Sequence, residues 1–357
     1  MKIDLFFWFF HVFYLLRNTN QTSNLSFKIK ALKWHKRLIF KICVSRFLCG
    51  IFLFFEKIIP QNKIALKLLH KEKPDLLLCP GSAMDSYSHF FLRSSKKLNI
   101  KSSMVISHWD YFTKKGLRFL PNKLLVWGED MKKQALSVTK ANHEDIEIIG
   151  SPYFDRIPAF CNNKKIKINK KSDNLKIMFA GTAIPYDELN ILNKLDKLIT
   201  KNNLKITIIY KPHPRAWDRK QSKSTIFKNI LFYRKTEVAL KDFLIFDGLI
   251  SPFSSMMIEF ALFKKPSLGI FYNDKLNDWP MNDLVNVKHI EPILDQKWFM
   301  YCIDEKMLKS TFMKFIKVIK KGDKKIFSNL DKIIYHEKKS TVHDRILKSI
   351  NDQIYHL

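Results

Sequence analysis

Three cationic or hydrogen-bonding side chains lie on a short proline-containing turn in the second half of the chain. The run Lys211-Pro212-His213-Pro214-Arg215 follows directly after the apolar stretch 206–210. Its two prolines hold the backbone extended, so the Lys, His and Arg side chains project from a stiff turn at the end of a predicted strand. Donors that are in place before a reaction stabilise the charge that accumulates on a departing phosphate. We therefore predict that Lys211, His213 and Arg215 bind phosphate; an ordinary proline-rich surface turn is the structural alternative.

A second group of polar side chains comes one predicted strand later. Ser254 and Ser255 follow the apolar run 248–251, and Glu259 stands four residues after Ser255. A serine at a helix start can cap the helix while its hydroxyl faces an anion, and Glu259, one turn further, can accept hydrogen bonds from ribose hydroxyls. A simple helix cap is the structural alternative. Thr182, which ends an earlier predicted strand, completes the predicted nucleotide-binding residues.

A third candidate group lies in the first half of the chain. His108-Trp109-Asp110 follow a predicted strand. A group-transfer reaction needs a base that takes the proton of the acceptor hydroxyl, and Asp110 or His108 can do this; Asp85 competes with them. The structural alternative is that Asp110 caps the following turn and Trp109 packs in the core. We count Asp110 and His108 as catalytic candidates, together with His213 as a donor to the leaving phosphate.

These candidates require a sheet that brings strand ends together, and the chain shows a matching pattern twice. Short apolar runs alternate with helical segments, which is typical of a parallel sheet covered on both faces. We predict strands at 75–79, 103–107, 124–128 and 146–152, then at 175–182, 206–210, 230–233, 248–251 and 266–271. The predicted fold class is α/β, with two Rossmann-like domains facing a cleft and helices at the C-terminus.

The predicted domain boundaries follow from length and composition. A chain of 357 residues is too long for one compact core. A Lys-rich segment without apolar periodicity indicates a solvated linker. We predict an acceptor-side domain at 1–161, the linker at 162–174, a donor-binding domain at 175–304 and Lys-rich helices at 305–357.

The net charge of +30 is strongly basic. Such a charge attracts phosphates, nucleic acid or an anionic membrane face. A composition rich in Lys, Ile, Asn and Phe, as A+T-rich genomes encode, accounts for part of this excess, so we predict no specific nucleic-acid partner. The five cysteines include no Cys-x-x-Cys pair, which indicates a reducing compartment and no structural zinc site.

The N-terminal residues bear on membrane attachment. The apolar run 5–16 has twelve residues, fewer than the ~20 that cross a bilayer, and no small-residue cleavage site follows it. A buried strand or shallow membrane attachment is therefore favoured over a signal peptide. Charges at Lys41, Arg46 and Glu56 interrupt the apolar segment 39–59, which disfavours a spanning helix. We predict a cytoplasmic protein, with peripheral attachment to the inner face of the cytoplasmic membrane as an open alternative.

Several motifs are absent from the sequence. No Asp-x-Asp motif occurs, so we expect no metal ion to hold a sugar diphosphate, and fixed protein donors must neutralise the leaving group. The chain also lacks the Gly-x-x-x-x-Gly-Lys and Gly-x-Gly-x-x-Gly loops and the Gly-x-Ser-x-Gly elbow. ATP hydrolysis, nicotinamide chemistry and serine hydrolysis are therefore disfavoured, and no cofactor is predicted.

The quoted motifs also carry a family resemblance. The Lys-Pro-His-Pro turn and the pattern from Asp247 to Glu259 resemble the donor-binding half of two-domain, GT-B-type glycosyltransferases and are similar to CDP-glycerol glycerophosphotransferases. The resemblance implies that His213 and the Ser254-Ser255 pair contact donor phosphate and that Glu259 contacts ribose. In the first half, segments 107–116, 124–127 and 150–155 resemble uncharacterised glycosyltransferase-like proteins of surface-carbohydrate loci.

These observations lead to one predicted function with alternatives. We predict a metal-independent glycosyltransferase that moves a sugar from a nucleotide-activated donor to a cell-surface glycan or a lipid-linked acceptor. A phosphotransferase that uses a CDP-activated glycerol or ribitol is the alternative. A nucleotide-sugar epimerase and a non-catalytic protein that binds anionic ligands stay open as well.

Overall fold

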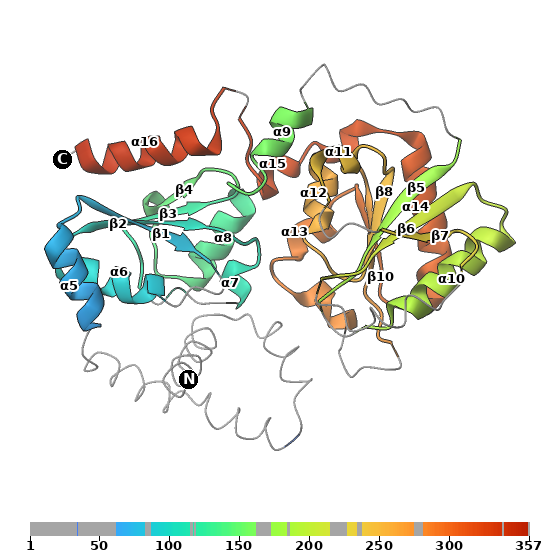
Figure 1. The fold of residues 1–357 in the computed structure, drawn as a ribbon, viewed down its shortest axis with the longest axis horizontal. Helices are drawn as coiled ribbons and strands as arrows, with labels where there is room; N and C mark the ends of the chain where they lie inside the picture. Colours follow the sequence, from blue (N-terminus) through green and yellow to red (C-terminus); the bar gives the residue numbers. More distant parts are fainter. Residues whose placement is uncertain are drawn as a thin grey trace. The chain divides into compact units, whose positions relative to one another are not determined.

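The computed structural model describes residues 34, 62–82, 87–114, 117, 119–161, 173–183, 186–214, 227–233, 238–274, 281–337 and 339–355 (Figure 1). Four predictions therefore lie outside the described residues: the membrane contact of the first 60 residues, the alternative base Asp85, most of the linker 162–174, and the phosphate ligand Arg215. Within the described ranges, no helix is both long enough and apolar enough to cross a membrane.

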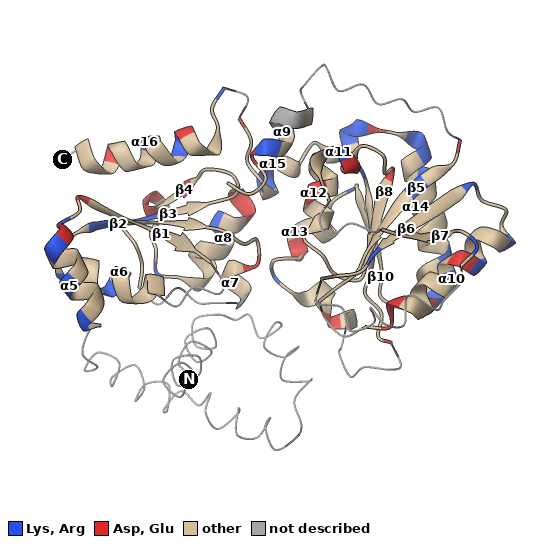
Figure 2. Cartoon of the chain, in the orientation of Figure 1, with Lys and Arg blue, Asp and Glu red and all other residues tan. Residues whose placement is uncertain are grey.

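The chain divides by its internal contacts into two units. The first unit comprises Met1–Asp155, Asn286–Pro292 and Asp331–Leu357, and the second comprises Arg156–Val285 and Ile293–Leu330. The C-terminal residues are thus shared between the units instead of forming a group of their own. Figure 2 shows Lys and Arg on helices of both units, α5 and α10 among them.

The first unit contains a four-stranded parallel sheet in the order β1-β2-β3-β4. Its strands are β1 (Leu76–Gly81), β2 (Lys101–Ile106), β3 (Lys123–Val126) and β4 (Ile146–Ile148), and its helices are α5 (Lys63–Glu72), α6 (Tyr87–Lys97), α7 (Tyr111–Lys114), α8 (Glu129–Val138), η1 (His143–Asp145) and α16 (Val342–Tyr355). Met104, Ile106 and Leu125 are fully buried, as expected for strands covered on both faces. All four strands occur where the apolar runs predict them.

The C-terminal helix α16 covers one face of this sheet, and Figure 1 shows α6 on the opposite side. Val342, at the start of α16, packs with Leu125 and Ile149 in a buried cluster. Near the end of the helix, Gln353 donates through Nε2 to Ser103 Oγ at 2.7 Å. These two partners are 250 positions apart, so the contact comes from tertiary folding alone.

The second unit contains a six-stranded parallel sheet in the order β10-β9-β8-β5-β6-β7. The strands are β5 (Leu175–Ala180), β6 (Ile206–Lys211), β7 (Ile230–Phe232), β8 (Gly248–Ser251), β9 (Ser267–Ile270) and β10 (Phe299–Cys302). From β5 the chain adds β6 and β7 on one side, then returns to place β8 on the other side of β5. The point between β5 and β8 is the topological switch point, where open α/β sheets bind ligands. The strand β10 was not predicted.

The helices of the second unit pack their apolar faces into its core. They are α9 (Arg156–Cys161), α10 (Glu188–Lys201), α11 (Leu240–Phe243), α12 (Met256–Leu262), α14 (Leu308–Lys321), η4 (Glu305–Met307) and η5 (Lys324–Phe327), with η3 (Met281–Asn286), α13 (Glu291–Leu294) and α15 (Leu330–Ile333) near the unit boundaries. Leu192 and Leu195 of α10 and Phe312 and Phe315 of α14 are fully buried, because each helix has an apolar stripe at a period of 3.6 residues. The two parallel sheets with their helices confirm the predicted α/β class and its two Rossmann-like domains.

Candidate functional site

The candidate site lies at the carboxyl ends of β5, β6 and β8 in the second unit. Ser251, the last residue of β8, donates its hydroxyl hydrogen to the Ala180 carbonyl oxygen at 2.7 Å, and Ser251 is fully buried. This bond joins the ends of the two strands at the switch point. On the other side of β5, Ala180 is in register with Lys211 of β6. The turns that follow the three strands therefore leave the same edge of one sheet.

A buried carboxylate that sequence reasoning missed holds two of these turns together. Glu188, the first residue of α10, is 3% exposed. Its Oε1 accepts a hydrogen bond from the Thr182 backbone N–H at 2.6 Å, and its Oε2 accepts one from the Tyr210 hydroxyl at 2.6 Å. Gly181 has no room for a side chain, because a Cβ there would lie 2.5 Å from Glu188 Oε2 and 2.9 Å from the His213 backbone nitrogen. Glu188 therefore fixes the turn after β5 against the end of β6.

The sequence offers a reason why Glu188 went unnoticed. An Asp-Glu pair at the start of a predicted helix is ordinary, since acidic residues favour the first helical turn. Asp187 does cap α10, because its Oδ1 accepts from the Asn190 backbone N–H at 3.1 Å. Nothing local indicates that the neighbouring carboxylate turns inward.

The predicted phosphate ligands occupy the turn that follows β6. Lys211 is the last residue of that strand, and both Lys211 and His213 are partly exposed. Their side chains are therefore within reach of a ligand at the sheet edge, whereas Thr182, in the turn that Glu188 fixes, is only 2% exposed. The predictions for Lys211, His213 and Thr182 thus converge at one edge.

The two predicted serines differ in environment. Ser254 Oγ accepts a hydrogen bond from the Met256 backbone N–H at 3.2 Å, so its hydroxyl supports the first turn of α12. Ser255 occupies the cap position, but its side chain makes no capping bond, and it is exposed. The alternative of a simple cap thus describes Ser254, while the Ser255 hydroxyl faces solvent.

Glu259 lies one turn into α12 and has an unusual ionisation. Burial raises the pKa of Glu259 to about 7, although the positive charges of Arg156 and Lys211 act in the opposite direction. Arg156, at the start of α9, was not predicted; it approaches because α9 packs against α12. The predicted ribose ligand Glu259 and the predicted phosphate ligand Lys211 thus interact electrostatically.

The proposed base candidates lie on a loop of the first unit. His108 is exposed, whereas Asp110 is only 6% exposed. The Asp110 carbonyl oxygen accepts from the Thr113 hydroxyl at 3.0 Å, and Thr113 Oγ1 lies 2.7 Å from His289 Nδ1. The Thr113 hydroxyl thus links the Asp110 carbonyl oxygen to the His289 ring, and the tautomer of the imidazole sets which partner donates in the second bond. Trp109 meets the His289 ring edge-on, with ring centroids 4.6 Å apart.

His289 was not predicted, because it comes from the segment Asn286–Pro292, far along the chain from the loop that it contacts. Among the residues that the structure describes, no three His, Cys, Asp or Glu side chains are grouped so that they could hold a metal ion.

The two parallel sheets and the turns at the switch point define a GT-B-type fold. The MnaA–UDP co-structure from S. aureus shares it, with 15% identity over 82% of this chain and 80% of that chain and a TM-score of 0.56. A putative UDP-N-acetylglucosamine 2-epimerase from Listeria monocytogenes has 12% identity over 82% of this chain and 76% of that chain, with a TM-score of 0.56. The structure of UDP-GlcNAc 2-epimerase from Neisseria meningitidis bound to UDP-GlcNAc has 15% identity over 80% of this chain and 78% of that chain, with a TM-score of 0.54. These likenesses show the fold, and the predicted GT-B architecture is confirmed.

A family model gives the more particular result. Residues 121–281 match the model of the family described as CDP-Glycerol:Poly(glycerophosphate) glycerophosphotransferase. The match contains the turn after β6, the serine pair and Glu259, and it confirms the resemblance that these motifs indicate. No curated protein matches the chain. The family match supports a transferase with a nucleotide-activated donor in the synthesis of surface polymers.

Proposed function

We propose that this protein transfers a group from a nucleotide-activated donor to a growing surface polymer, without a divalent metal ion. The observation that carries the proposal is that Lys211, His213, Thr182 and Glu259 lie at the ends of strands β6, β5 and β8 or in the segments that follow them, and these strands end at one edge of the second sheet. Lys211 and His213 would stabilise the charge on the leaving phosphate, and Glu259 would hold the ribose hydroxyls. Arg215 and the hydroxyls of Ser254 and Ser255 complete the proposed donor site.

Two donors fit this site, and the leaving group distinguishes them. With a CDP-activated polyol, the acceptor oxygen attacks the distal phosphorus, the bond between the two phosphates breaks and CMP leaves. With a nucleotide sugar, the oxygen attacks the anomeric carbon and a nucleoside diphosphate leaves. In both cases the acceptor hydroxyl loses its proton to a base, for which Asp110 and His108 are the proposed candidates. The family match favours the CDP-polyol, and the sugar donor is the second candidate.

A nucleotide screen by thermal shift tests the proposal first. A ligand that binds the native state raises the melting temperature in proportion to the logarithm of its concentration over Kd. Stabilisation by CMP and CDP supports a CDP-polyol, and stabilisation by UDP or GDP supports a sugar donor. Turnover of a nucleotide sugar without any acceptor identifies an epimerase instead. Steep salt-dependent binding without nucleotide preference identifies a non-catalytic anion-binding protein.

His213→Ala tests the central residue once a donor is known. Loss of one preorganised donor to the leaving group costs about 10²–10³ in kcat. The control is His70→Ala, which removes an exposed histidine from α5 in the first unit. If His213→Ala turns over at the rate of His70→Ala, the phosphate-binding role of this turn is wrong.

A further inference from the structure

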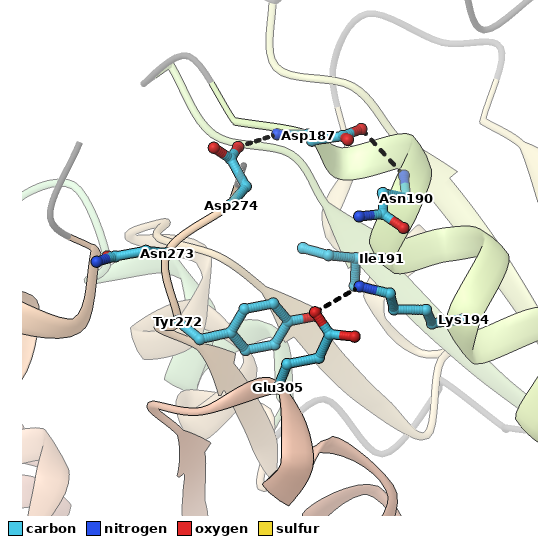
Figure 3. A pocket seen from close by; sticks show the side chains of 8 residues that line it. All are labelled: Asp187, Asn190, Ile191, Lys194, Tyr272, Asn273, Asp274 and Glu305. Carbon is cyan, nitrogen blue, oxygen red and sulfur yellow. Dashed lines mark hydrogen bonds and ion pairs between the residues drawn. The ribbon is translucent and has the colours of Figure 1, made fainter. Parts of the chain in front are cut away.

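A pocket lies in the second unit, and none of the proposed donor ligands line it. Its volume is about 260 Å³. One wall is a single face of α10, formed at i, i+3 and i+7 by Asp187, Asn190 and Lys194 (Figure 3). The loop after β9 and the start of η4 form the rest.

The charge of this pocket is opposite to that of the chain. Three carboxylates, from Asp187, Asp274 and Glu305, face a single ammonium group, from Lys194, so the lining carries a formal charge of −2 in a chain of net charge +30. Lys194 Nζ already forms an ion pair with Glu305 Oε2 at 2.8 Å. Asp187 and Asp274 are neighbours in this lining, since Asp274 Oδ2 accepts from the Asp187 backbone N–H at 2.6 Å. The net negative charge of the lining would attract a positively charged ligand.

A buried hydroxyl supplies the second, independent observation. Tyr272 lines the pocket and is only 4% exposed. Among the residues that the structure describes, none forms a hydrogen bond with its hydroxyl. Figure 3 shows the ring extending toward the Lys194–Glu305 pair, and Lys194 Nζ lies 5.9 Å from the ring centroid. Burial raises the pKa of Tyr272, so the group remains an O–H that can donate to a ligand oxygen.

We propose that this pocket binds a small protonated amine that also carries hydroxyl groups, of the size and chemistry of an amino sugar. The ammonium group would lie between the carboxylates of Asp187 and Asp274, and a hydroxyl oxygen would accept the hydrogen of the Tyr272 hydroxyl. The proposal does not depend on the proposed transferase function, because every residue involved lies outside the proposed donor site. The pocket would take this ligand with or without a nucleotide on the sheet edge.

The first test uses two probes that differ in charge. Calorimetric titration of the full chain with D-glucosamine and with D-glucose, without nucleotide, compares a cationic and a neutral sugar of similar shape. Charge-assisted hydrogen bonds contribute more than neutral ones, so we expect the neutral sugar to bind about tenfold more weakly or worse. Binding of D-glucosamine must persist in His213→Ala, which separates this site from the donor site. Absence of saturable D-glucosamine binding, or equal affinity for both sugars, would overturn the proposal.

Two variants then locate the site. Asp274→Asn removes one charge but keeps an oxygen that can accept the Asp187 N–H, so we expect about tenfold weaker D-glucosamine binding with little loss of stability. Tyr272→Phe removes only a hydroxyl without a partner in the described structure. Its melting temperature should hold or rise, while the affinity for D-glucosamine falls about three- to tenfold.

Tyr233→Phe is the matched control. The Tyr233 hydroxyl donates to Asp242 Oδ2 at 2.6 Å, away from the pocket, so this variant should lose stability and keep the affinity for D-glucosamine. If Tyr272→Phe and Asp274→Asn both bind D-glucosamine as tightly as the wild type, the pocket holds water only and the proposal is wrong.

Discussion

The ionisation of Glu259 offers the sharpest test of the donor site. Burial raises the pKa of Glu259 to about 7. If Glu259 holds the ribose as a hydrogen-bond acceptor, the carboxylate form is the one that binds. The affinity for the nucleotide should then rise with pH as Glu259 loses its proton. Glu259→Gln keeps the shape of the side chain and removes this titration.

The magnitude follows from the ionised fraction. For a group with a pKa of about 7, about 9% is ionised at pH 6 and about 91% at pH 8. The affinity of the wild type should therefore increase about tenfold over this interval relative to Glu259→Gln. The nucleotide phosphate and other groups of the site also titrate between pH 6 and pH 8. They do so in both proteins, so the ratio of the wild-type affinity to the Glu259→Gln affinity isolates the effect of Glu259.

Without nucleotide, the free energy of unfolding should fall as the pH rises, whereas the nucleotide affinity should increase. The pKa of Glu259 is raised on folding from its ordinary value of 4.5, so the folded state binds the proton more tightly than the unfolded state. The contribution of Glu259 to stability is therefore full below about pH 4.5 and is lost as the pH rises through about 7. The free energy of unfolding of Glu259→Gln should not show this decrease, because Gln does not titrate.

The assay is a titration of the best nucleotide from the screen at pH 6, 7 and 8, followed by denaturant unfolding without nucleotide at the same pH values. A ratio of wild-type to Glu259→Gln affinity that stays constant from pH 6 to pH 8 would refute the ribose role. A ratio that falls with pH would show that protonated Glu259 acts as a donor instead.

Two further predictions concern glycines in close contact. Gly181→Ala would place a methyl group 2.5 Å from Glu188 Oε2, so we expect a loss of about 1–3 kcal/mol in the free energy of unfolding, with weaker nucleotide binding; an unchanged affinity would contradict the role of this turn. Gly150 has φ +85, and a Cβ there would lie 2.5 Å from the Tyr335 carbonyl oxygen. In Gly150→Ala, the free energy of unfolding measured with denaturant should decrease by about 2–5 kcal/mol. Gly322→Ala, with φ +63 and nothing within 4 Å, should lose only about 1–2 kcal/mol; equal losses would contradict the crowding at Gly150.

The sequence by itself determined the strands next to the candidate donor site and the sheet edge that carries it, although it did not reveal β10. Apolar runs such as 206–210 and 248–251 identify strands, because a strand covered on both faces must be apolar throughout. The turn that contains His213 and the pair Ser254-Ser255 come directly after such strands, and parallel strands direct their carboxyl ends to one edge. These inferences need only local periodicity and turn chemistry.

Tertiary structure alone decided which side chains meet. Glu188 bonds to Thr182 and Tyr210, Arg156 approaches Glu259, and His289 reaches Thr113, and none of these pairs has a local signal. The strand order that creates the switch point and the placement of α16 on the first sheet have the same origin. Apart from the Glu188–Thr182 bond, which spans six positions, these features depend on contacts between residues far apart in the chain, whose energies arise only when the sheets pack. The ionisation of Glu259 also depends on that packing, because burial sets its pKa.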